Sequence, residues 1–133
     1  MKNIIFLFVA LVLLTSNIYY AQSGASGKQK QQYIYVLHLE KSMWDSTAWT
    51  PDKMKIAQEH FAHLQKLLAD GILILGGKTQ TPLNQTIGIV IYEAGSLEEA
   101  KAIAENDPAV KEKIMNVEVF PYKIALMKNA EKK

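Results

Sequence analysis

The order of strand-patterned and helix-patterned segments is the feature that most constrains how this chain can fold. Four short runs rich in β-branched and aromatic residues predict strands, at residues 33–40, 72–77, 86–94 and 116–126. Helical patterns fill two of the gaps, from Pro51 to about Ala69 and over roughly 97–105. The order β-α-β-β-α-β predicts an α+β sandwich with a ferredoxin-like βαββαβ arrangement.

Local signals support both helices. Thr50 is a suitable N-cap with Pro51 at the first helical position, and Gly71 is placed to end this helix in a left-handed conformation. Ser96 and Glu99 form a capping box for the second helix. The helix boundaries are therefore predicted from residue chemistry as well as from periodicity.

The strands are apolar on both of their alternating faces, although helices can cover only one face of such a sheet. The opposed sets are Ile34 and Val36 against Leu37 and Leu39, Ile72 and Ile74 against Leu73 and Leu75, and Ile87 and Ile89 against Val90 and Tyr92. An uncovered apolar face needs a partner, and a second copy of the same face is the simplest one. We therefore expect a homodimer packed sheet to sheet.

The length and charge of the chain limit its organisation and its partners. Its 133 residues fit one small domain, expected at residues 32–127, followed by a charged tail at 128–133. The 15 basic and 13 acidic residues are interspersed, so no basic patch predicts nucleic-acid binding.

The N-terminus has the pattern of a secretory signal peptide. An apolar run from Ile4 to Leu14 follows one lysine and precedes small and polar residues, with cleavage expected after Ala21 or Ala25. The run is shorter than the ~20 residues that span a bilayer, although an uncleaved anchor is the alternative. Residues 1–25 thus predict export to a secreted or periplasmic location, with no membrane span left after cleavage. The absence of cysteine excludes disulfides and a thiol nucleophile.

Two histidines lie one turn apart on the first helix. On a helical wheel, one stripe of apolar residues forms the expected core face: Met54, Ala57, Phe61, Leu64 and Leu68. Relative to this stripe, His60 lies at the boundary between core and solvent, and His63 lies on the polar side. A boundary histidine can be tuned near neutral pH and act as an acid or base. It can equally make one structural hydrogen bond, and Asp107 before Pro108 can be only a helix cap.

A metal site is the weaker reading of these histidines. The segment "EHFAH" is not the HExxH motif of metalloproteases, and no third ligand is evident. We expect no metal and no cofactor. His38 on the first strand is a candidate to line the same cavity.

Taken together, "HFAHLQKLLADGILILGG", "GIVIYEAGSLEEAKAIAENDPAV" and "VEVFPY" resemble the YciI-like (YCII-related) family of small dimeric proteins, from about Tyr33 to Tyr122. The resemblance implies a ferredoxin-like fold of the dimeric α+β barrel type, with a histidine and an aspartate in a cleft. In this chain those positions are His60 and Asp107.

Three positions depart from the family pattern. Lys78 stands where proline is common, Lys113 where glycine is usual, and Phe120 where close relatives carry histidine, followed by Tyr122 in place of tryptophan. The first and last changes are expected to alter a cleft wall.

The leading hypothesis is a cofactor-independent lyase or isomerase that acts on a small, cyclic or aromatic organic acid. His60 would be the general acid/base, with Asp107 holding its tautomer. Trp44 and Trp49 would cover the cleft, and Lys78 would meet a carboxylate. The alternatives are a non-catalytic envelope protein that binds a small ligand, and a structural or stress-associated dimer without a ligand.

Overall fold

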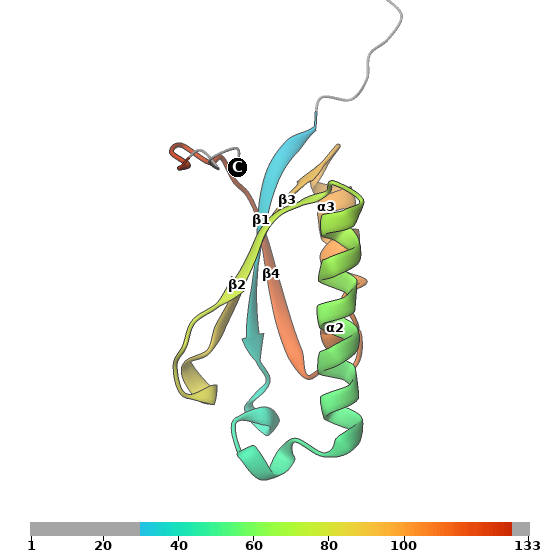
Figure 1. Cartoon of the computed structure of the whole chain (residues 1–133), viewed down its shortest axis with the longest axis vertical. Helices are drawn as coiled ribbons and strands as arrows, with labels where there is room; N and C mark the ends of the chain where they lie inside the picture. The colour runs from blue at the N-terminus through green and yellow to red at the C-terminus, as the bar shows by residue number, and fades with distance from the viewer. Residues whose placement is uncertain (1–29, 129–133) are drawn as a thin grey trace, which may run out of the picture.

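A computed structural model describes residues 30–128 of the protein. Its strands and helices follow the predicted order (Figure 1). The strands are β1 (Gln31–Leu39), β2 (Leu73–Lys78), β3 (Ile87–Ala94) and β4 (Met115–Pro121). The helices are α2 (Pro51–Ala69), α3 (Leu97–Glu105) and the short α4 (Pro108–Lys111), and single 3-10 turns are η1 (Lys41–Met43), η2 (Ser46–Ala48) and η3 (Leu83–Gln85).

The four strands form one antiparallel sheet in the order β2-β3-β1-β4. Helices α2 and α3 lie on the same side of this sheet (Figure 1). Strands β1 and β3 are the two central strands, and the helices cover one face. This is the ferredoxin-like arrangement, so the predicted fold class is confirmed.

The element boundaries agree with the sequence signals, with one exception. The Thr50 hydroxyl caps α2 by accepting from the Lys53 amide, and Gly71 ends the helix at a φ of 69°. The last strand ends at Pro121 and does not continue to residue 126 as expected. Beyond it the chain stays tied to β1, since the Tyr122 amide donates to the Gln32 carbonyl at 2.9 Å.

The core lies between the sheet and the helices. Tyr33, Tyr35 and Leu37 of β1 point into it, as do Val90 and Tyr92 of β3. Small residues of α3, such as Ala100, let that helix lie close to the sheet, where Tyr92 donates its hydroxyl proton to the Ala100 carbonyl at 2.8 Å. Burial of these large side chains accounts for much of the stability, at about 1.5–3 kcal/mol for each fully buried one.

The predicted core stripe of α2 is wrong for three of its five residues, although Leu64 packs against the core as expected. Met54, Phe61 and Leu68 are 49%, 60% and 58% exposed, whereas Leu67 is buried. Compared with the predicted orientation, α2 is turned about its own axis. Helix α4 packs against it, and the contact between His60 and Asp107 lies on the side that faces α4. Apolarity along the helix therefore does not identify its buried face, and the exposed stripe borders a cleft described below.

One departure from the family pattern has a backbone consequence. Lys113 has a φ of 53°, in the left-handed region that glycine adopts without a steric penalty. The lysine at this position is therefore held in a strained turn between α4 and β4.

The second face of the sheet carries the other apolar set. The strand register places Ile34 beside Ile91 on one side and Phe120 on the other, and Val36 beside Ile89 and Glu118. Phe120 is thus not part of a cleft on the helix side. Among residues 30–128, no helix is long and apolar enough to cross a membrane. The signal-peptide prediction falls on residues 1–25, outside the described residues.

Candidate active site

Asp107 is a fully buried carboxylate at the start of α4. Its side chain is 0% exposed, and Oδ1 accepts from the Ala109 amide at 2.9 Å as the N-cap of the helix. Pro108 occupies the first helical position, where its missing N–H costs nothing. The cap expected from the sequence is present, but it uses only part of the hydrogen-bonding capacity of the carboxylate.

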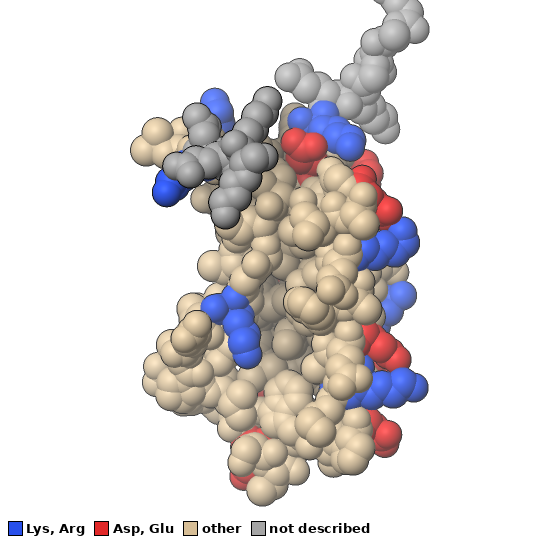
Figure 2. Space-filling model, viewed as in Figure 1, with Lys and Arg blue, Asp and Glu red and all other residues tan. Residues whose placement is uncertain are grey.

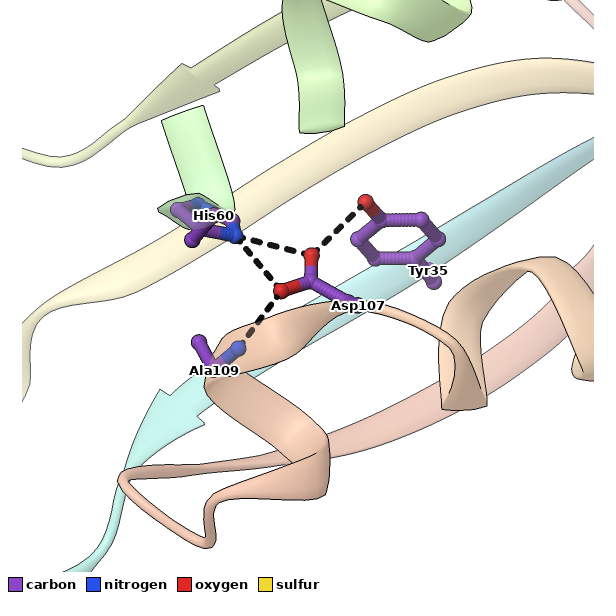
Figure 3. Close-up of polar contacts among 4 residues, drawn as sticks. All are labelled: Tyr35, His60, Asp107 and Ala109. Atoms are coloured by element: carbon purple, nitrogen blue, oxygen red, sulfur yellow. Dashed lines mark hydrogen bonds and ion pairs between the residues drawn. The ribbon is translucent and has the colours of Figure 1, made fainter. Parts of the chain in front are cut away.

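His60 supplies the next contact. Its Nδ1 lies 2.8 Å from both Oδ1 and Oδ2 of Asp107 (Figure 3). The imidazole reaches from α2 and its side chain is only 15% exposed. Because an ionised carboxylate can only accept, this contact selects the form with a proton on Nδ1. In the neutral ring, Nε2 then carries the free lone pair.

Tyr35 completes the cluster from β1. Its hydroxyl donates to Asp107 Oδ2 at 3.3 Å, from a side chain that is fully buried (Figure 3). Burial, the charge of Asp107 and the hydrogen bond to it raise the pKa of Tyr35 well above its usual range. The phenol therefore stays protonated and donates. Three elements, β1, α2 and α4, together fix the orientation of one carboxylate.

The prediction for His63 is wrong. Its Nε2 is buried without a hydrogen-bond partner among the described residues, so it is not a solvated bystander. Burial lowers the pKa of His63, opposed by the charge of Asp107 and assisted by the charges of His60, Lys111 and Lys66. The same rotation of α2 that exposes Phe61 brings His63 inward.

The lowered pKa of His63 predicts a loss of stability in acid. The unfolded chain takes up a proton at His63 near the ordinary value of ~6.5, whereas the folded state resists it. This contribution is therefore complete above about pH 6.5 and is lost as pH falls from there through the folded-state pKa. Urea unfolding at pH 7.5 and 5.5, about one unit on either side of that value, should give a smaller pH-dependent loss for His63→Gln than for wild type. Equal losses in the two proteins would contradict this account.

A cleft of about 650 Å³ opens between α2 and the β2–β3 side of the sheet. Figure 2 shows the surface hollowed here, with mostly uncharged walls. Leu37 and Val90 belong to its floor, and Phe61, Leu64 and Leu68 to its α2 wall. His60 lines the cleft, whereas Asp107 lies behind it and is not among the lining residues. Volume and apolar lining are typical of a small-molecule site.

The structure brings some of the predicted site residues to this cleft and places others elsewhere. Trp49 and Lys78 line it together with His60. Trp44 does not line it; its indole N–H donates to the Leu39 carbonyl at 3.2 Å, which makes it an anchor of the loop. His38 lies on the opposite face of β1, 4.0 Å from Glu118, because Leu37 and Leu39 take the cleft side. The expectations for Trp44 and His38 as cleft residues are therefore corrected.

Two features were missed in the sequence. Tyr35 shares the core face of β1 with Leu37, and a buried tyrosine usually needs a partner for its hydroxyl, which is the signal that could have found it. Gly76 and Gly88 were also assigned no role from the sequence, although both line the cleft. Over residues 30–128, no group of three or more His, Cys, Asp or Glu side chains is arranged to hold a metal ion.

Comparison with known proteins supplies a family and a fold. The model of the YCII-related domain matches residues 34–123, more than half of the chain. A search of curated proteins gives no match.

Two solved structures are similar to the chain. One is 5-chloro-2-hydroxyhydroquinone dehydrochlorinase (TftG) from Burkholderia phenoliruptrix AC1100 in complex with 2,5-dihydroxybenzoquinone, with 21% identity, a TM-score of 0.53, and coverage of 69% of this chain and 93% of that one. The other is the uncharacterised protein TM1266 from Thermotoga maritima, with 14% identity, a TM-score of 0.49, and coverage of 71% and 100%. The likeness to TftG supports the ferredoxin-like fold.

Proposed function

Because the chain belongs to the YCII-related domain family and its cleft holds a histidine fixed by a buried carboxylate, we propose that it is a small-molecule enzyme of the lyase or isomerase type. It works without a cofactor in this proposal, since His60 and Asp107 supply the acid/base chemistry. The single observation that carries the proposal is the contact of His60 Nδ1 with both oxygens of Asp107, on the inner side of a cleft that His60 lines.

The proposed reaction begins with proton transfer to His60. Nε2 takes a proton from an activated C–H bond of the substrate, and the positive charge of the resulting imidazolium is stabilised by the Asp107 carboxylate. In a lyase, the electron pair left on carbon forms a double bond as a leaving group departs with its own pair from the neighbouring carbon. In an isomerase, the imidazolium returns the proton to another carbon. Both outcomes balance with no other reactant.

The hydrogen-bond network supports this role over a purely structural one. A structural histidine needs one hydrogen bond, which any acceptor would provide. Here the acceptor is a buried carboxylate that also receives donors from Tyr35 and Ala109, and Nε2 of His60 has no hydrogen bond to another described residue. Such an arrangement is the usual means of fixing a catalytic tautomer. TftG is a dehydrochlorinase, and removal of HCl from a substrate is an elimination of the same reaction class.

Deuterium exchange tests the proposed function without a known substrate. The full chain is incubated in D2O with small carbon acids, and loss of their C–H signals is followed by proton NMR. The proposal expects at least one acid to exchange faster with wild-type protein than with His60→Gln. Binding of such acids with no exchange by either protein would instead favour the rival function, a non-catalytic ligand-binding protein.

We also propose that two chains form a homodimer through the face of the sheet opposite the helices. The strand register brings six apolar residues together at the centre of this face. They are Ile34, Val36, Leu75, Ile89, Ile91 and Phe120. Charged side chains such as Glu93 and Glu118 lie among or beside them. A second copy offers the same residues about a twofold axis.

The substitution Val36→Lys is expected to convert the dimer into a monomer. It places a charge at the centre of the apolar face, while its neighbour Glu118 can pair with the new ammonium and keep the monomer folded. Light scattering should give half the wild-type mass. Ala102→Lys, at an exposed position of α3, is the control that should remain dimeric. A monomeric wild type would contradict the proposal.

Export to the cell envelope also stays a proposal, carried by the signal-peptide pattern at residues 1–25. Sequencing the N-terminus of protein from the periplasm or the medium should give Gln22 or Ser26; an intact N-terminus in the cytoplasm would exclude export.

A further inference from the structure

The floor of the cleft is built from backbone where two neighbouring strands carry glycine. Gly76 of β2 pairs with Val90, and Gly88 of β3 pairs with both Leu37 and Lys78. All of these residues line the cleft. Glycine at such positions lets a ligand approach the backbone closely, and strands otherwise avoid it. The cleft therefore reaches bare backbone at Gly76, whereas the side chain of Leu37 covers Gly88.

The two glycines are not equivalent. A Cβ at Gly88 would lie 3.1 Å from the Cβ and 3.4 Å from the Cδ1 of Leu37, so the Leu37 side chain already occupies the space above Gly88 and disfavours a side chain there. A Cβ at Gly76 would lie 3.7 Å from Leu73 Cδ1 and 4.0 Å from Leu64 Cδ1, which are ordinary contacts. Packing within the chain therefore leaves room for a side chain at Gly76, and the space above it belongs to the cleft.

Aromatic surface faces the same space. Phe61 of α2 lines the cleft and is 60% exposed, an unusual position for a large apolar side chain. Trp49 closes another side, and its indole N–H donates to the Met43 carbonyl at 3.2 Å, which fixes the ring. A flat apolar ligand would cover both surfaces.

The permanent charge among the residues that line the cleft is positive. Lys78 is the only permanently charged residue among the lining residues, and His60 is the only other ionisable one. Lys78 makes no ion pair within 4.0 Å in the described part of the chain. The register places its backbone beside Gly88, so its side chain starts at the wall of the cleft. An anionic group on the ligand would supply the missing partner.

We propose that the cleft binds a flat aromatic carboxylate, with its ring on the exposed backbone at Gly76 and its carboxylate at Lys78. This proposal rests on the proposed function, since it names the class of substrate that would be presented to His60. It also assigns Gly76 and Lys78 as the residues that determine specificity, one for shape and the other for charge.

The test uses three probes of the same skeleton on the full chain. Naphthoate is the flat anion, naphthamide is its neutral counterpart, and decalin carboxylate is an anion of similar size that is not flat. Titrations followed by amide NMR should give the tightest binding for naphthoate, with shift changes at residues of β2, β3 and α2. Lys78→Gln should weaken naphthoate binding about tenfold, equivalent to about 1.4 kcal/mol, and leave naphthamide unchanged. Gly76→Val should abolish naphthoate binding.

Matched variants keep the outcome interpretable. Lys123→Gln, at an exposed position beyond β4, removes the same charge elsewhere and should leave naphthoate binding unchanged. If Gly76→Val fails to fold, Gly76→Ala, whose Cβ meets only ordinary contacts, replaces it and should weaken binding. Equal affinity for naphthoate and naphthamide, no effect of Lys78→Gln, or no binding at the cleft would each overturn the proposal.

Failure of this inference is distinguishable from failure of the proposed function. The binding measurements depend on Lys78 and Gly76, whereas the deuterium-exchange test depends on His60. Exchange of a neutral carbon acid without naphthoate binding would retain the enzyme and reject the aromatic carboxylate. Tight naphthoate binding without any His60-dependent exchange would retain the ligand class and reject the enzyme.

Discussion

Replacement of His60 by glutamine is expected to slow catalysed proton transfer by roughly 10²–10⁴-fold, the usual contribution of a positioned general base. Glutamine retains a polar group at the boundary of the cleft and can still donate to Asp107, so the fold should persist. It has no group that accepts a proton from carbon near neutral pH. The measurement is the rate of deuterium exchange into an acid that the wild-type protein exchanges.

His63→Gln is the matched control for this substitution. It changes a histidine on the same helix, also half-buried, whose ring makes no hydrogen bond through Nε2 within residues 30–128. Its exchange rate should stay close to that of wild type. Equal losses in both variants would indicate a general effect of disturbing α2, and an unchanged rate in His60→Gln would reject His60 as the base.

Replacement of Asp107 by alanine is expected to lower the free energy of unfolding by about 3–5 kcal/mol, because it removes the shared acceptor of three donors in the buried network, at about 1–3 kcal/mol for each buried group left unsatisfied. Part of the loss is the helix cap, worth about 1 kcal/mol. The rest comes from two donors left without an acceptor, namely the Tyr35 hydroxyl and His60 Nδ1–H. Urea unfolding at neutral pH measures the difference.

A second aspartate at a helix end provides the control. Asp70 follows α2 and pairs with Lys66 at 2.6 Å, but both side chains are exposed. Its replacement by alanine should cost less than about 1 kcal/mol, since exposed ion pairs contribute little. A loss of similar size for the two variants would show that the buried network around Asp107 has no special stability.

Most of the fold was predictable because it depends on local signals that tertiary packing does not override. The caps at Thr50 and Ser96 and the left-handed Gly71 set the helix boundaries, and the order of the segments then permits few topologies. The buried face of α2 was not predictable from its own sequence. The apolar residues Phe61 and Leu68 border a cleft, and His60 faces inward because the Asp107 carboxylate from a distant segment contacts it there.

The contact between His60 and Asp107 was predictable from the sequence, whereas the other residues around Asp107 were not. His60 at a boundary position and Asp107 in the family pattern were both recognised, and they lie in contact. Tyr35, which also donates a hydrogen bond to Asp107, is 72 residues away from it in the chain. No local sequence pattern could predict that these two residues come into contact. The true position of His38, on the face of the sheet opposite the helices, could have been predicted. Side chains alternate along a strand, and Leu37 and Leu39 occupy the core side of β1.

The most direct test of the central claim is the tautomer of His60, measured by nitrogen-15 NMR of the imidazole at about pH 8.5, where an ordinary histidine is neutral. The account predicts a proton on Nδ1 and an unprotonated Nε2 in the wild type. It also predicts loss of this preference in Asp107→Asn, whose amide can donate as well as accept. A wild-type ring with its proton on Nε2 would contradict the account, because the nitrogen left for the cleft would then be unable to act as a base.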